Sequence, residues 1–311
     1  SDETPLPERL DFVTIEGTKR ANPDVLEEQM RTREGGPLDM KVLEGDLARL
    51  HGRGEFEEID YEVVTIGRQQ GLVVKVTEKS WGPNFLRFGL SLSTDLQGET
   101  WFNLMAGHKR VWVNRLGAEW TNEIILGSTR RYATEFYQPL TLSNRVFASA
   151  YGLVQRAPEY AFDGATREAE YDVLTQTAGL DLGVPFGTAG ELRVGFKWEH
   201  KREDPVIAPA VVDPNLLIPN FTVKSDETGA RVLFRWDTLD NPYFPRQGVR
   251  VNAEGFFGNR SVSLPTCPLD VCSLPRESSS RAGVYANVAV PLGRRDFLNV
   301  AGQVGAITRT R

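Results

Sequence analysis

The chain has 311 residues, of which 40% are hydrophobic and 25% are charged, and its formal net charge is −6. This acidic balance argues against nucleic acid as the main partner. No run of 18 apolar residues occurs, so the sequence offers no segment of the kind that crosses a bilayer as a helix. Strands that cross a membrane are not excluded, because their apolar residues alternate with polar ones and the average composition looks soluble.

The first ten residues, "SDETPLPERL", are typical of a linker. They have neither the basic start nor the apolar stretch of a secretory signal. If the protein is exported, we expect its signal, and a further domain, to lie upstream.

Residues 11–80 predict a small domain with the order β-α-α-β-β. Asn22 is a candidate N-cap before Pro23, and the glycines at 35–36 are expected to end that first helix. A second helix is predicted after Asp39, because three leucines fall on one face at helical spacing: Leu43, Leu47 and Leu50. Two strands follow around residues 67–71, which suits two helices on one face of a short sheet.

After residue 80 the apolar residues alternate with period two, as in "ELRVGFKWEHK". This pattern predicts strands with one apolar and one polar face. About eleven such segments are expected, at residues 85–94, 100–110, 114–125, 130–138, 144–157, 168–183, 189–202, 225–237, 248–259, 280–290 and 298–308.

Alternation alone fits either a soluble antiparallel sheet or a membrane barrel. The barrel is favoured because the segments are long enough for a crossing, which needs ~9–11 residues. Aromatic side chains also lie near many segment ends, as a membrane-interface girdle requires. The candidate interface aromatics are Trp81, Trp101, Trp112, Trp120 and Tyr137.

The connections give a further test of the barrel. With residues 11–80 in the periplasm, the outer connections would be 95–99, 126–129, 158–167, 203–224 and 260–279. The periplasmic ones would be 111–113, 139–143, 184–188, 238–247 and 291–297. The three longest connections all fall on the outer side, as barrels of this kind require.

The only two cysteines, Cys267 and Cys272, fall in one of these outer connections. In an oxidising compartment they could form a small loop disulfide, and the alternative is two free thiols. They do not make a convincing zinc site, because His51, His108 and His200 are scattered along the chain. We therefore expect no metal and no cofactor.

Charged residues fall on the faces that we expect to point inward: Arg87, Glu135, Arg193, Lys197, Glu199, Arg231, Arg235 and Glu254. They could define a conduction path. The plainer interpretation is that a wet lumen tolerates ion pairs.

Two stretches carry a family likeness. The β-α-α-β-β domain resembles a POTRA domain, the periplasmic module of the superfamily that includes BamA, TamA and two-partner secretion transporters. The stretch "DTLDNPYFPRQGVRV" is similar to the turn and strand of that superfamily's surface-antigen domain. Its motif residues are Asp237, Asp240, Asn241, Phe244, Pro245 and Gly248. We interpret the motif mainly as structural, with docking of a module or an assembly partner as the alternative.

Two further stretches, "WGPNFLRFGLSLSTDLQG" and "RRYATEFYQPL", resemble the C-terminal half of bacterial patatin-like proteins, the type Vd autotransporters. There a secreted phospholipase domain precedes one POTRA domain and a sixteen-strand barrel. The resemblance implies a linker at 1–10, a POTRA domain at 11–80 and a C-terminally truncated outer-membrane barrel at 81–311. About five strands and a lumen-folding loop would then lie beyond this chain.

The resemblance implies a translocator or anchor that secretes or displays an N-terminal patatin-like phospholipase. This chain has no G-x-S-x-G motif, so we predict no catalytic residue in it. The expected partners are the lipid bilayer, the passenger or a secreted client, and the outer-membrane assembly machinery. Two alternatives remain: a stand-alone assembly or secretion factor of the TamA, BamA or two-partner type, and a soluble β-rich protein active on lipid or carbohydrate.

Overall fold

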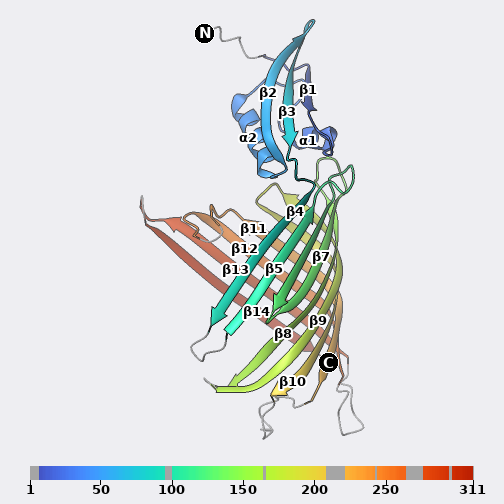
Figure 1. Cartoon of the computed structure of the whole chain (residues 1–311), viewed down its shortest axis with the longest axis vertical. Coiled ribbons are helices and arrows are strands. Elements are labelled where there is room, and N and C mark those ends of the chain that lie inside the picture. Colours follow the sequence, from blue (N-terminus) through green and yellow to red (C-terminus); the bar gives the residue numbers. More distant parts are fainter. Residues whose placement is uncertain are drawn as a thin grey trace. The chain divides into compact units, whose positions relative to one another are not determined.

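The computed structural model describes residues 7–94, 100–163, 166–207, 221–241, 244–263, 276–293 and 296–310 (Figure 1). The chain divides into two compact units. The first comprises Ser1–Leu86, His108–Thr121 and Phe136–Phe147, and the second comprises Arg87–Gly107, Asn122–Glu135 and Ala148–Arg311.

A small α+β module occupies the first part of the chain, in the predicted order β-α-α-β-β. Strand β3 lies in the middle of its sheet, parallel to β1 and antiparallel to β2. Leu26 and Leu43 of the helices pack with Val74 of β3 in one buried core. The elements are β1 (Phe12–Glu16), α1 (Pro23–Gln29), α2 (Met40–Gly52), β2 (Phe56–Ile66) and β3 (Gln69–Glu78).

Helix α1 begins where the sequence predicts, with the Asn22 side chain accepting a hydrogen bond from Asp24 N. It ends at Gln29, however, well before the glycines at 35–36. The reason is a contact from α2: the buried Asp46 carboxylate accepts hydrogen bonds from the backbone N–H groups of Arg31 (2.9 Å) and Thr32 (2.8 Å). In a continuing helix these N–H groups would bond to the carbonyls four residues earlier.

Glu78, the last residue of β3, holds the loop between β1 and α1. Its carboxylate accepts hydrogen bonds from the backbone N–H groups of Lys19, Arg20 and Ala21, each 2.8 Å long, and from Arg20 Nε at 2.9 Å. Burial raises the pKa of this carboxyl, but the bonds from Ala21, Arg20 and Lys19 more than offset it and lower the pKa to about 2. The loop is therefore fastened by an ionised side chain.

We expect acid to weaken this fastening in a defined pH range. The folded-state pKa is depressed from 4.5 to about 2, so the stabilisation is complete above pH 4.5 and is lost as the pH falls through 2. Across that range the opening free energy of the module should fall by about 2 kcal/mol more in the wild type than in Glu78→Gln. Hydrogen exchange of β1 and β3 amides in the full chain measures it.

The matched control is Glu62→Gln, which removes a carboxylate that pairs with the exposed Lys75 at 2.6 Å. Its pH dependence should follow that of the wild type. An equal slope for all three proteins would contradict the role given to Glu78.

The remaining strands form one antiparallel sheet in which every strand pairs with its sequence neighbours, from β4 at one edge to β14 at the other (Figure 1). The strands are β4 (Asn84–Thr94), β5 (Thr100–Arg110), β6 (Glu119–Gly127), β7 (Arg130–Pro139), β8 (Phe147–Asp163), β9 (Thr166–Phe186), β10 (Gly190–Ile207), β11 (Val223–Asp237), β12 (Gly248–Ser263), β13 (Glu277–Pro291) and β14 (Phe297–Thr310).

The predicted eleven strands are confirmed in number and order, but several limits differ. Strand β6 starts at Glu119 and not at residue 114, because residues 111–118 form a turn in which Val113 N bonds to Ala118 O at 2.9 Å. Strands β8 and β9 are longer than expected, at 17 and 21 residues. Pairing with neighbouring strands extends them beyond the part that apolar alternation marks.

The sheet has one apolar face and one polar face, as the alternation predicts. In register across β9, β10 and β11, Leu182, Val194 and Val232 form one row of the apolar face. The next residues along each strand, Asp181, Gly195 and Arg231, form a row of the polar face. The apolar side chains are exposed, to 60% for Leu182, so this face is available for contact with lipid. None of the helices among the described residues is long and apolar enough to span a bilayer.

Candidate functional site

The family-like turn between β11 and β12 is organised by polar side chains. Asp240 Oδ1 accepts hydrogen bonds from the backbone N–H groups of Arg246 (2.9 Å) and Gln247 (3.2 Å), and these bonds lower the pKa of the Asp240 carboxyl. Asn241 Oδ1 accepts a bond from Phe244 N at 2.9 Å. Side-chain oxygens thus replace the strand ladder and define the path of the turn.

Gly248 lets the turn rejoin the sheet. It has a φ of +110°, and a Cβ at this position would lie 2.2 Å from the carbonyl oxygen of Thr238. Thr238 N in turn donates to Val249 O at 2.9 Å, and Val249 N donates to Thr238 Oγ1 at 3.0 Å. Glycine is therefore required here by both backbone conformation and space.

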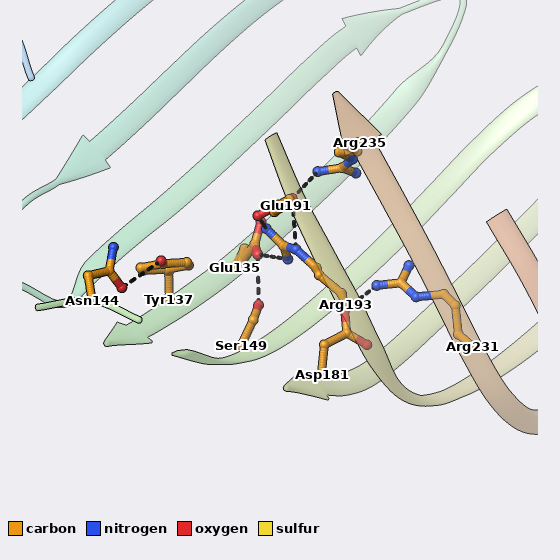
Figure 2. Close-up of polar contacts among 9 residues, drawn as sticks. All are labelled: Glu135, Tyr137, Asn144, Ser149, Asp181, Glu191, Arg193, Arg231 and Arg235. Carbon is orange, nitrogen blue, oxygen red and sulfur yellow. Dashed lines mark hydrogen bonds and ion pairs between the residues drawn. The ribbon is translucent and has the colours of Figure 1, made fainter. Parts of the chain in front are cut away.

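The polar face carries a network of ion pairs and hydrogen bonds that joins β7, β8, β10 and β11 (Figure 2). Arg193 of β10 donates two bonds to Glu191, from Nε at 2.8 Å and from Nη2 at 3.0 Å, and a third from Nη1 to Glu135 of β7. Ser149 of β8 donates to the same Glu135 oxygen at 2.7 Å. Arg235 of β11 donates to Glu191 at 3.3 Å. The Arg193 side chain is only 9% exposed, so its charge depends on these partners.

Glycines on the intervening strands make room for the long cationic side chains. Arg193 is in register with Gly183 of β9, and it reaches past β9 and β8 to Glu135. The guanidinium of Arg231 on β11 reaches Asp181 on β9 across Gly195 of β10. A Cβ at Gly195 would lie 2.1 Å from Oδ1 of Asp181, the residue that the Arg231 guanidinium reaches.

The second ion pair also has an aromatic contact. The Arg231 guanidinium lies 4.4 Å from the ring centroid of Tyr151 on β8. Together with Asp181 on β9, this contact joins three strands of the polar face. Figure 2 shows the Asp181–Arg231 pair beside the Arg193 network.

Sequence reasoning identified only part of this site. Glu135, Arg193, Arg231 and Arg235 were expected on the inward face, and the structure brings them into one polar region. Their partners Asp181, Glu191, Ser149 and Tyr151 were missed as members of a network. Strand register was the missing information. Most of these partners lie on a different strand from the residue that they contact, and the sequence does not show which residues of two strands face each other.

The candidate interface aromatics have different surroundings. Trp81 and Trp120 are exposed, to 61% and 43%. Trp101 is half-buried. The ring of Tyr137 packs against that of Phe147 in a tilted arrangement with centroids 4.4 Å apart, and its hydroxyl donates to Asn144 at 3.0 Å. Trp112 packs against the core of the small module and not into an open surface.

The remaining candidate residues are the cysteines and the histidines. Cys267 and Cys272 lie outside the described residues. His200 Nδ1 lies 2.8 Å from Asp226 Oδ1, and His108 Nε2 lies 3.1 Å from Asn84 Oδ1, neither of which the sequence indicated. Within the ranges that the structure describes, no group of three or more histidine, cysteine or acidic side chains is placed to hold a metal ion.

Comparisons with known proteins agree with this architecture. Residues 9–79 match the POTRA family, described as "Surface antigen variable number repeat". Residues 114–307 match the family described as "Omp85 superfamily domain". Among solved structures, BamA from Haemophilus ducreyi lacking POTRA domains 1–3 is similar, with a TM-score of 0.64 and 16% identity. That match covers 97% of this chain and 55% of that one, so this chain spans about half of its length.

A second similar structure is CdiB from Acinetobacter baumannii, with 12% identity and a TM-score of 0.44. The match covers 97% of this chain and 68% of that chain.

Proposed function

Because the chain belongs to the Omp85 superfamily, we propose that it is the barrel-and-POTRA part of an outer-membrane protein that transports or inserts other polypeptides. Membership implies a Gram-negative outer membrane, with the POTRA-like module in the periplasm. The proposed division is a linker at 1–10, the module at 11–80 and the barrel at 81–311, completed to sixteen strands by residues outside this chain.

The observation that carries this proposal is the two-faced sheet. One face presents exposed apolar side chains suited to lipid, and the other presents charged side chains suited to a wet lumen. The charges of the ion pairs in the polar network balance. The three carboxylates of Glu135, Asp181 and Glu191 face the three guanidinium groups of Arg193, Arg231 and Arg235. A wall whose charges are already compensated gives a passing segment few fixed charges to bind, which suits transport.

The finer proposal is that the transported polypeptide is an N-terminal passenger that resembles a patatin phospholipase. The stretches "WGPNFLRFGLSLSTDLQG" and "RRYATEFYQPL" support it by their likeness to type Vd autotransporters. In this proposal the chain translocates and anchors the passenger mechanically, and none of its residues takes part in covalent chemistry. The partners are the bilayer, the passenger and the outer-membrane assembly machinery.

The second candidate is a stand-alone assembly or secretion factor. The fold shared with BamA favours it as much as it favours the autotransporter, since the barrel-and-POTRA architecture is common to both. The two differ in what the protein handles: a domain of its own chain, or other proteins.

One experiment separates them. The gene is deleted, and the surface content of other outer-membrane barrels is measured beside the surface exposure of the protein's own N-terminal region, by protease treatment of intact cells. A passenger transporter should leave other barrels at wild-type levels. A general loss of other barrels would contradict the passenger proposal. So would an upstream sequence that encodes further β-α-α-β-β repeats before Ser1 in place of a G-x-S-x-G domain.

The soluble alternative has its own test. Refolding is compared in buffer and in detergent micelles or vesicles. We expect a folded, monodisperse product only with detergent or lipid, because the exposed apolar face would otherwise associate. A folded product in buffer alone would overturn the membrane assignment.

Phe244 tests whether the family-like turn also docks a partner. Its side chain is 76% exposed although its backbone N–H is fixed by Asn241. If the turn only connects strands, Phe244→Ala should change neither stability nor transport. If it docks a module or an assembly partner, the variant should keep wild-type stability, within about 0.5 kcal/mol, and lose transport. Unfolding and surface display of the same variant are measured side by side, with the exposed Leu292→Ala as control.

A further inference from the structure

The turn at residues 111–118 is attached to the small module by side chains, and all the residues concerned lie in the first compact unit. Trp112 Nε1 donates to Glu55 Oε2 at 2.8 Å. Glu55 is buried and also binds Arg53, whose Nε and Nη2 lie 3.2 and 3.1 Å from its two oxygens. The Arg53 guanidinium also lies 5.3 Å from the centroid of the Trp112 ring. Trp112, Glu55 and Arg53 thus form one closed group.

A second contact lies elsewhere on the same turn. Asn22 Nδ2 donates to the carbonyl oxygen of Arg115 at 3.0 Å. The other end of the Asn22 amide caps α1, through Oδ1 and Asp24 N at 3.1 Å. One side chain therefore both starts the first helix of the module and binds the turn.

The backbone of the turn is strained at Trp112, which has a φ of +53°. Positive φ is a genuine outlier for a bulky side chain, and it persists only where surrounding contacts enforce it. Gly117 leaves room for the ring, since a Cβ there would lie 3.2 Å from it. The contacts of the indole thus hold a backbone conformation that relaxes when they are lost.

The turn thus combines a strained backbone at Trp112 with two side-chain bonds to the small module. We propose that residues 111–118 are a latch for the small module, closed by Trp112 on Glu55 and by Arg115 on Asn22. Release of the indole relaxes the backbone at Trp112 and frees the module. This device is independent of which polypeptide the protein handles, so it stands or falls apart from the proposed passenger.

The test measures the distance between spin labels at exposed positions 44 and 142, one on α2 and one outside the latch. The labels are placed in the full chain with Cys267 and Cys272 replaced by serine. Trp112→Phe keeps an aromatic ring but removes the N–H. Asn22→Ser keeps a good helix cap but removes the donor to Arg115. Trp120→Phe is the matched control, an exposed tryptophan of β6 outside the latch.

We expect one narrow distance distribution in the parent protein and in Trp120→Phe. In Trp112→Phe a second, longer component should grow by roughly tenfold, the usual effect of losing one hydrogen bond to a carboxylate, and Asn22→Ser should show the same component. Each variant is first checked for folding by its mobility in unheated SDS gels. A single unchanged distribution in both latch variants would overturn the proposal, as would an equal change in Trp120→Phe.

Discussion

Replacing Gly248 by alanine is expected to prevent the sheet from assembling between β11 and β12. The added Cβ would lie 2.2 Å from the carbonyl oxygen of Thr238 and 2.9 Å from Leu239 Cα, and both are backbone atoms. The φ of +110° adds conformational strain for any residue with a side chain. We expect a loss of more than about 3 kcal/mol. The measurement is the fraction of protein that keeps its folded mobility in unheated SDS gels.

Gly302→Ala is the control, because Gly302 lies on β14 and a Cβ there would meet nothing within 4 Å. It should leave the folded fraction unchanged. The comparison of the two variants separates the effect of a side chain at this turn from the general effect of replacing a glycine in a strand. Wild-type folding of Gly248→Ala would mean that the turn can take another path, and the structural role of the motif would then be wrong.

The importance of Gly248 could be inferred from the sequence, and this shows what local patterns can predict. Proline, asparagine, aspartate and glycine in "DTLDNPYFPRQG" specify a turn through bonds between residues that are close in the sequence, such as Asp240 with Gln247. The order β-α-α-β-β and the eleven strands follow in the same way, from caps and from alternation over neighbouring residues. These features need no knowledge of distant contacts.

The end of α1 and the polar network could not be predicted in that way. Helix α1 stops because the carboxylate of Asp46, fifteen residues from Arg31, accepts a hydrogen bond from the backbone N–H of Arg31. Glu135 and Arg193 are 58 residues apart and meet only because the register of the intervening strands brings them together. A one-residue change of register would turn all these side chains to the other face, and alternation does not fix it.

The polar network is the source of the second large effect. Arg193→Met is expected to destabilise the sheet by about 3–5 kcal/mol, because it leaves Glu135 without its cation and Glu191 with only the contact from Arg235. Arg235→Met removes the same charge from a side chain that is 52% exposed and makes a 3.3 Å contact with Glu191. It should cost less than about 1 kcal/mol. Unfolding by urea in vesicles gives both values.

A further variant separates charge from packing in this network. Adding Glu135→Gln and Glu191→Gln to Arg193→Met removes the unpaired carboxylates while keeping the shape of the side chains. If uncompensated charge dominates, the triple variant should recover a large part of the loss, since replacing a complete buried ion pair costs far less than removing one partner. If Arg193→Met and Arg235→Met proved equally mild, solvent would screen the whole face, and the network would be a consequence of a wet lumen and not a brace between its strands.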